Sequence, residues 1–356
     1  MSDALPRTIF VGRGVTSICW YRCALPAMAL GMEWVGLRHD PPQTEIVTAM
    51  TERPFALEHL YDYEVVVLQQ PASPAWHRLI RRLQAAGIAV LFEIDDYIHA
   101  VRKMATHEAR AHFGKEMLRH AEASMRMADG VICSTDYLAR RYGRFNPRTF
   151  VCRNGLDLRR YDLERPARDG VVIGWAGGTG HVAAMQPWLA GVRDVMAARP
   201  ETRFVTIGQN FAGDFAEEFG AERCLSVPFT QLETYPAAMT MFDVALAPSA
   251  QNNLFRGKSD LRWLEASALG IPLVADPGVY PEIEHGVTGF HAATPASTSA
   301  HWRDITWMER RLHTWARAAS PTRARSASSS TSAVRWARIS SGVAAWKPVT
   351  PCSISG

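Results

Sequence analysis

Residues 258–290 read KSDLRWLEASALGIPLVADPGVYPEIEHGVTGF, and this stretch indicates a helix followed by a strand. Lys258 and Ser259 precede a run with apolar residues at helical spacing, which stops at Gly270, with Pro272 two residues later. A glycine just past the last apolar position and a proline soon after it are typical of a helix C-terminus. The apolar segment IPLVA then predicts a buried strand, so the stretch is a helix–strand unit of an α/β protein.

The start of this helix suits a bound anion. The first backbone N–H groups of a helix have no partner within the helix, and Lys258 adds a positive charge beside them. We therefore expect a diphosphate to bind here, in contact with Lys258 and Ser259. Glu265 lies six residues after Ser259, under two helical turns along, where its carboxylate can accept hydrogen bonds from sugar hydroxyls.

This stretch resembles the donor-binding half of GT-B glycosyltransferases, specifically glycosyltransferase family 4. The resemblance rests on a glutamate-bearing helix, then ALGIP, then a glutamate and HGVTG, in that order. The family signature has two glutamates with seven residues between them. Glu265 matches the second, whereas Gly257 occupies the first position. The NNLFRGKS run resembles a variant that shares this departure, which makes Asn253 a further expected substrate contact. A plain helix–strand unit of another doubly wound protein is the alternative.

The resemblance covers most of residues 7–290 and implies an α/β fold of the GT-B type, with two Rossmann-like doubly wound domains facing across a cleft. Strand and helix signals alternate through both halves of the chain, as parallel sheets with helices on both faces require. The charged linker RRYDLERPARDG separates an acceptor-side domain, residues 1–160, from a donor-binding domain, residues 170–292.

The segment VVIGWAGGTGH predicts a strand, a glycine-rich turn and a helix, without the dinucleotide fingerprint G-x-G-x-x-G. In the family this turn borders the sugar-nucleotide site, which makes Gly177, Gly178, Thr179 and Gly180 expected substrate contacts. His181 is a candidate catalytic residue that can hydrogen-bond a phosphate or the transferred sugar, with a structural histidine as the alternative. Family members often carry Arg and Lys just after this strand. Neither occurs here, so we expect Lys258 to carry more of the phosphate binding.

In the first half, EIDDYIHA ends a predicted strand, which places Asp95 and Asp96 at the carboxyl edge of the sheet, where α/β proteins bind ligands. Either carboxylate can orient an acceptor hydroxyl or take its proton, and both are candidate catalytic residues. A metal pair and a helix cap are the alternatives. The resemblance places Gly12 and Gly14 at the substrate cleft and Arg22 near a phosphate, with a surface salt bridge as the other interpretation of Arg22.

Bulk composition excludes several classes of protein. A chain of 356 residues with 47% hydrophobic residues can bury two cores, and no apolar run is long enough for a transmembrane helix. The six cysteines form no C-x-x-C pair and indicate buried thiols in a reducing cytoplasm, so we expect no metal and no cofactor. Before residue 291 acidic residues slightly outnumber basic ones, which gives no reason to expect nucleic acid as a partner.

The basic excess lies in residues 293–356, a tail rich in Ser, Arg and Ala with five tryptophans and no acidic residue after Glu309. This composition is typical of a GC-rich gene read in the wrong frame, and a disordered basic tail is the alternative. Resequencing of the gene distinguishes the two.

The sequence therefore predicts a cytoplasmic glycosyltransferase, a hexosyl- or related transferase, that moves a sugar from a nucleotide-sugar donor to a glycan or lipid-linked glycan. The resemblance implies retention of the anomeric configuration and allows peripheral contact with the inner membrane, although no amphipathic anchor supports that contact. An inactive homologue that binds the donor without turnover, and a nucleotide-sugar epimerase, are the alternatives.

Overall fold

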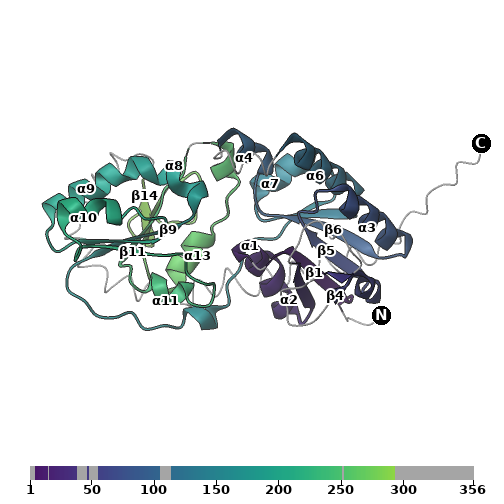
Figure 1. Cartoon of the computed structure of the whole chain (residues 1–356), viewed down its shortest axis with the longest axis horizontal. Coiled ribbons are helices and arrows are strands. Elements are labelled where there is room, and N and C mark those ends of the chain that lie inside the picture. Colours follow the sequence, from purple (N-terminus) through teal and green to yellow (C-terminus); the bar gives the residue numbers. More distant parts are fainter. Residues whose placement is uncertain are drawn as a thin grey trace, which may run out of the picture. The chain divides into compact units, whose positions relative to one another are not determined.

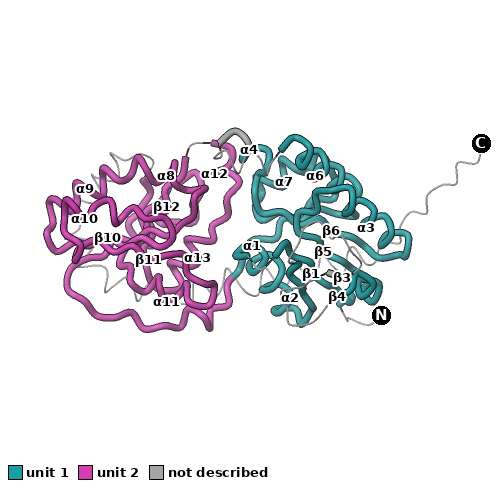
Figure 2. Tube along the Cα trace, viewed as in Figure 1, with its two compact units in different colours: residues 1–155, 329–356 teal, residues 156–328 magenta. Residues whose placement is uncertain are grey.

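The structure is a computed structural model that describes residues 5–14, 16–37, 46–47, 55–104, 114–250 and 252–292. These residues form two compact units that divide between Gly155 and Leu156 (Figure 2). Each unit contains a six-stranded parallel sheet with helices packed on it (Figure 1). The tail predicted to begin at residue 293 lies outside the described residues.

Unit 1 has the sheet order β2-β1-β5-β6-β7-β8, with a separate antiparallel pair of two-residue strands, β3 and β4. The strands are β1 (Thr8–Arg13), β2 (Glu33–Leu37), β3 (Ile46–Val47), β4 (Phe55–Ala56), β5 (Val65–Gln69), β6 (Ala89–Ile94), β7 (Gly130–Cys133) and β8 (Thr149–Val151). The helices are α1 (Ser17–Cys19), η1 (Trp20–Ala24), α2 (Leu25–Leu30), η2 (Leu57–Asp62), α3 (Pro74–Ala85), α4 (Ile98–Met104), α6 (Lys115–Met127) and α7 (Asp136–Tyr142).

Strand β5 shows why this sheet is covered on both faces. All five of its residues, VVVLQ, are buried. Val65 and Val67 belong to one apolar cluster, whereas Val66 and Leu68 belong to another. Because successive side chains of a strand point to opposite faces, the two clusters are the cores on the two sides of the sheet.

The helical segment from Ser17 to Leu30 is interrupted by a π-helical turn, η1. The N–H of Leu25 bonds to the carbonyl of Trp20, one residue further back than in an α-helix. Pro26 follows directly and has no N–H, so it cannot continue the α-helical bonding through this turn. The interruption is therefore a widened turn that carries Tyr21 and Arg22.

Unit 2 has the sheet order β11-β10-β9-β12-β13-β14. Its strands are β9 (Val172–Gly177), β10 (Arg203–Gly208), β11 (Cys224–Val227), β12 (Val244–Ala247), β13 (Leu273–Ala275) and β14 (Gly289–His291). Its helices are η3 (Leu158–Tyr161), η4 (Thr179–His181), α8 (Val182–Met185), η5 (Gln186–Trp188), α9 (Leu189–Ala198), η6 (Gly213–Phe215), α10 (Ala216–Phe219), α11 (Tyr235–Met239), α12 (Asn253–Arg256) and α13 (Leu261–Ala268).

The helix–strand unit predicted from residues 258–290 is confirmed as α13 and β13. Gly270 has a φ of 67° and its N–H bonds to the carbonyl of Ser267, while Ile271 N–H reaches the carbonyl of Ala266. These two bonds close the helix with a Schellman motif, which favours glycine at the left-handed position. Helix α11 begins at Tyr235, because Pro236 is tolerated only in a first helical turn.

Gly174 in β9 provides a test of the core of unit 2. A Cβ at this position would lie 2.0 Å from Cγ of the buried Phe242 ring. We expect Gly174→Ala to lower the free energy of unfolding by about 1–3 kcal/mol, because an overpacked core must shift. The control is Gly180→Ala, where an added Cβ meets nothing within 4 Å. Urea denaturation of both variants measures the difference; equal stabilities would contradict this packing.

Two further findings concern membrane-spanning helices and cysteine reactivity in the described part of the chain. No helix in it has the length and apolar character needed to cross a membrane. Cys19, Cys23, Cys133, Cys152 and Cys224 are buried free thiols. Burial raises the pKa of Cys23 and Cys133, so both remain protonated and unreactive in the folded state.

Candidate functional site

The sheet of unit 2 has a switch point between β9 and β12. The chain runs outward from β9 to β10 and β11 on one side, then returns to β12 on the other side. In open α/β sheets, ligands bind outside the carboxyl ends of the strands at such a point. Gly177 ends β9 and Ala247 ends β12, so the predicted glycine turn lies at the position where a ligand is expected.

The guanidinium group of Arg262 lies against this turn. A Cβ added to Gly177 would be 2.9 Å from Nη2 of Arg262 and 2.6 Å from Cζ2 of Trp175. Glycine at 177 therefore leaves room for a cation from the first turn of α13 beside the end of β9. The turn continues through Gly178 into η4, where the N–H of His181 bonds to the carbonyl of Gly178.

His181 lies next to two cations. Arg262, then burial and then Lys258 lower the pKa of His181 to about 2, so its imidazole is neutral at physiological pH. The ring packs edge-on against Phe255 of α12, with 5.7 Å between the ring centroids. Its Nδ1 is buried and makes no hydrogen bond to any described residue. A neutral imidazole in this place can donate or accept one hydrogen bond without adding charge.

The loop between α12 and α13 carries the other predicted anion contacts. Asn252 caps α12, since its Oδ1 accepts hydrogen bonds from the N–H groups of Leu254 at 2.9 Å and Phe255 at 3.1 Å. Asn253 is exposed on the first turn of α12, whereas Lys258 and Ser259 are partly buried. Lys258 N–H bonds to the carbonyl of Phe255 at the end of α12, and Lys258 and Ser259 directly precede Asp260, the N-cap of α13.

Glu265 is 4% exposed and lies among tyrosines rather than in open solvent. The hydroxyl of Tyr161 donates to Oε1 of Glu265 at 3.5 Å. Burial raises the pKa of Tyr280 to about 12, with Glu265 adding to the shift and Arg262 opposing it. The same balance of Glu265 and Arg262 acts on Tyr235, whose pKa burial raises well above its usual value. Arg262 and Glu265 are three residues apart, on one face of α13.

Sequence reasoning missed Arg262. A second cation was expected only among the residues just after β9, whereas in the structure Arg262 of α13 lies beside Gly177. The spacing of Arg262 and Glu265 along the helix was the available signal. With it, the structure groups the glycine turn, His181, Lys258 and Arg262 in unit 2, and Glu265 lies on the Arg262 face of α13.

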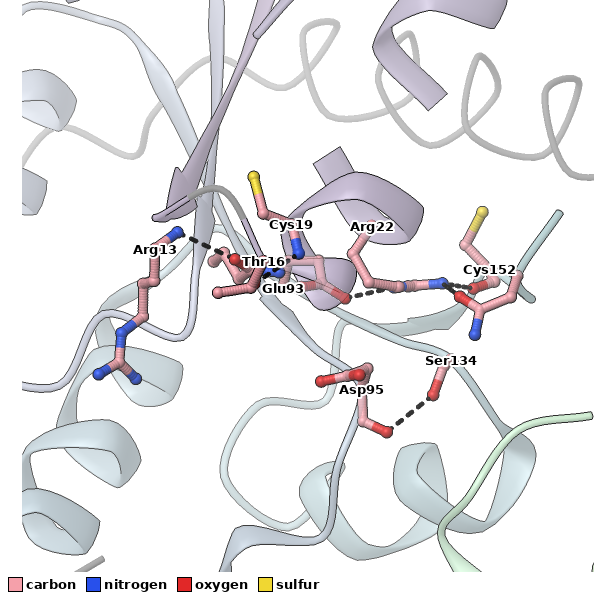
Figure 3. Close-up of polar contacts among 10 residues, drawn as sticks. Arg13, Thr16, Cys19, Arg22, Glu93, Asp95, Ser134 and Cys152 are labelled. Carbon is pink, nitrogen blue, oxygen red and sulfur yellow. Dashed lines mark hydrogen bonds and ion pairs between the residues drawn. The ribbon is translucent and has the colours of Figure 1, made fainter. Parts of the chain in front are cut away.

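In unit 1 the predicted glycines have identifiable local roles. A Cβ on Gly12 would be 2.1 Å from Sγ of Cys19, so glycine allows α1 to pack directly on β1. Gly14 has a φ of 77°, in the left-handed region that favours glycine. Beyond it, the hydroxyl of Thr16 accepts a hydrogen bond from Cys19 N–H and caps α1, and Arg13 N–H bonds to Gln69 Oε1 at 2.9 Å (Figure 3).

Arg22 lies inside unit 1, so the surface salt bridge considered from the sequence is wrong. Its side chain is 1% exposed and Nε bonds to Oε1 of Glu93 at 2.6 Å. Nη1 donates to the carbonyl of Cys152 at 2.7 Å and to Oδ1 of Asn154 at 2.9 Å (Figure 3). Burial opposes the charge, but Glu93 raises the pKa of Arg22 above its usual value, so the guanidinium remains protonated. A phosphate contact by Arg22 stays a prediction.

The turn that carries Asp95 and Asp96 is anchored through its backbone. Ser134 Oγ donates to the carbonyl of Asp95 at 3.1 Å (Figure 3). The hydroxyl of Tyr142 donates to the carbonyl of Asp96 at 2.8 Å and accepts from Ile98 N–H at 3.0 Å. Both aspartates follow β6 directly and are partly exposed, at the carboxyl edge predicted for them.

The described residues contain no group of three His, Cys, Asp or Glu side chains placed to hold a metal ion. The expected absence of a cofactor stays a prediction. The polar groups that the structure shows at this end of unit 2 are two cations, a neutral histidine and the buried Glu265.

Comparison with known proteins supports the fold. No protein-family model matches the chain, and no curated protein matches its sequence. Among solved structures, Anabaena HepE in complex with UDP and glucose has a TM-score of 0.65 at 15% identity, covering 94% of this chain and 98% of that one. The lipopolysaccharide outer core galactosyltransferase WaaB has a TM-score of 0.57 at 12% identity, covering 94% and 98%.

A Listeria monocytogenes protein described as a UDP-N-acetylglucosamine 2-epimerase has a TM-score of 0.58 at 14% identity, covering 97% of this chain and 98% of that one. At these identities the likeness concerns the fold. The predicted fold class is confirmed: two doubly wound units with parallel six-stranded sheets, as in structures of GT-B glycosyltransferases.

Proposed function

We propose that this protein is a glycosyltransferase that takes a sugar from a nucleotide-sugar donor and transfers it to a glycan or lipid-linked glycan. The observation that carries the proposal is the guanidinium of Arg262 against Gly177 at the switch point of unit 2, with Lys258 adding its positive charge at the neighbouring His181. Two cations beside a turn that admits close backbone approach suit a diphosphate.

The proposed chemistry depends on stabilising the leaving group. The bond between the anomeric carbon and the diphosphate breaks, and the departing nucleoside diphosphate gains negative charge. Lys258, Arg262 and the first N–H groups of α13 offset this charge, which is the electrostatic contribution that lowers the barrier. His181 is neutral in the free protein, so it hydrogen-bonds the phosphate or the sugar without repelling either cation.

The remaining predicted residues take supporting roles in this proposal. Glu265, with Tyr161 donating to it, accepts hydrogen bonds from hydroxyl groups of the donor. Asp95 or Asp96 orients the acceptor hydroxyl from unit 1 and takes its proton. Retention of the anomeric configuration is part of the proposal through the resemblance to family 4. The glycine at position 257, in place of the first signature glutamate, leaves the contact to the donor sugar to other residues.

The test is incubation of the full chain with a panel of nucleotide sugars, with and without glycan acceptors. Acceptor-dependent release of the nucleoside diphosphate, together with a glycosylated product, would establish the transferase. The likeness to the Listeria protein favours one alternative, an epimerase, which would change the sugar nucleotide without any acceptor. Binding of the donor with neither reaction would identify an inactive homologue.

The charge state of His181 is a separate prediction. Its folded pKa of about 2 lies below the usual 6.5, so the unfolded chain binds a proton that the folded chain does not. Its contribution to stability is therefore present above pH 6.5 and is lost as pH falls below it. NMR should show no titration of His181 between pH 5 and 8. Arg262→Gln should raise the pKa toward 6.5, and an ordinary midpoint in the unmodified protein would contradict the cation cluster.

A further inference from the structure

Phe229 is an exposed aromatic side chain in the loop after β11. It is 65% exposed, more than the other exposed large apolar residues described in unit 2, of which Leu225 reaches 49%. A single exposed apolar side chain is common on protein surfaces and by itself indicates nothing. The position of this ring relative to the glycine turn gives it significance.

The ring lies over the carboxyl ends of two neighbouring strands. A Cβ on Gly178 would be 3.5 Å from Cζ of Phe229, and a Cβ on Gly208 would be 2.9 Å from Cε1. Gly208 ends β10 and pairs in register with Gly177 at the end of β9. One edge of the ring, at Cε1 and Cζ, thus lies against glycine backbone at the sheet edge, while most of the side chain is exposed to solvent.

The ring and the Arg262 guanidinium flank consecutive residues of one turn. Nη2 of Arg262 is 2.9 Å from the position of a Cβ on Gly177, and Cζ of Phe229 is 3.5 Å from that of a Cβ on Gly178, so the two groups approach the sheet edge at neighbouring residues. A nucleoside diphosphate has two matching parts: a planar base at one end and negatively charged phosphates at the other. A cation alone suits any anion, whereas a cation followed by an exposed ring suits an anion that carries an aromatic group.

We propose that Phe229 is the surface on which the base of the nucleoside diphosphate stacks while its phosphates contact Arg262 and Lys258. This inference rests on the proposed function and adds a residue that recognises the nucleoside. Stacking on an aromatic ring tolerates any base, because every base has a π-face. Phe229 therefore contributes affinity for each nucleotide that binds, and hydrogen bonds to the base edge determine which nucleotide that is.

The experiment measures binding of UDP, ADP, GDP and inorganic pyrophosphate to the full chain by calorimetry. In Phe229→Ala we expect affinity for the nucleoside diphosphates that bind to fall about tenfold or more, equivalent to about 1.4 kcal/mol, with pyrophosphate affinity unchanged. Phe229→Tyr should retain the affinity. Leu225→Ala, which removes another exposed apolar side chain from β11, is the matched control and should change neither ligand.

Three outcomes would overturn the inference. Unchanged nucleotide affinity in Phe229→Ala, an equal loss for pyrophosphate, or a similar loss in Leu225→Ala would each remove the stacking role while leaving the proposed function intact. If the unmodified chain binds none of the three nucleoside diphosphates, the donor site and the stacking surface both fail. Because Phe229 is mainly exposed, thermal unfolding of the variant should match that of the unmodified chain, which excludes misfolding as the cause.

Discussion

Lys258→Ala is expected to bind UDP about 10- to 100-fold more weakly than the unmodified protein, because a charge-assisted hydrogen bond to phosphate contributes about 1.5–3 kcal/mol. Arg262→Gln should cause a loss of similar size, since its guanidinium lies against Gly177 at the same turn. Asp95→Ala, which alters unit 1, should leave UDP affinity almost unchanged. Calorimetric titration of the three variants with UDP measures the order of their affinities.

The double variant Lys258→Ala/Arg262→Gln sharpens this result. If both cations contact one diphosphate, their effects are coupled, and the double loss will differ from the sum of the single losses. A weaker effect of Lys258→Ala than of Asp95→Ala would contradict the assignment of the donor to unit 2. An unaltered affinity in both single cation variants would show that the nucleotide binds elsewhere or not at all.

The second large effect concerns stability. Arg22→Met should lower the free energy of unfolding by about 3–5 kcal/mol, because it leaves Glu93 as a buried carboxylate without its cation. Burial already raises the pKa of Glu93, with Arg22 opposing that shift, so the variant should take up a proton at this carboxyl group. Urea denaturation measures the loss, and hydrogen exchange of the β6 amides locates it in unit 1.

Arg153→Ala is the matched control for this measurement. Arg153 pairs with Asp136 at 2.9 Å, but the two side chains are 45% and 58% exposed. Pairs in this setting contribute about 0–1 kcal/mol, so the control should differ little from the unmodified chain. Equal losses in Arg22→Met and Arg153→Ala would show that the buried pair is not the structural element described above.

Local elements were predictable from sequence because each carries its own boundary signal. Helix α3, Pro74–Ala85, has a proline in its first turn and Gly87 beyond its end, and both residues are visible in the sequence as helix boundaries. The α13–β13 unit followed from the apolar spacing and from Gly270. Such signals depend on a few neighbouring residues, so one sequence is enough to recognise them.

Contacts between distant segments were harder to predict. Arg22 meets Glu93, Cys152 and Asn154, which are 71 to 132 residues away along the chain. An arginine in an amphipathic helix is usually exposed, and no local pattern indicates that three partners converge on it. The position of Arg262 is also non-local, because the spatial order of the strands in the sheet decides which helix begins beside Gly177.

Tyr142 holds the backbone that follows the end of β6. Its hydroxyl bridges the Asp96 carbonyl and the Ile98 N–H, from a helix 46 residues further along the chain. The backbone of Asp96 is thus held from α7 and that of Asp95 by Ser134, so both anchors lie outside the acidic run. Substitution of Tyr142 would alter the backbone that carries Asp96 while both aspartates stay unchanged, so the Asp-Asp pair alone does not define the geometry at this edge of the sheet.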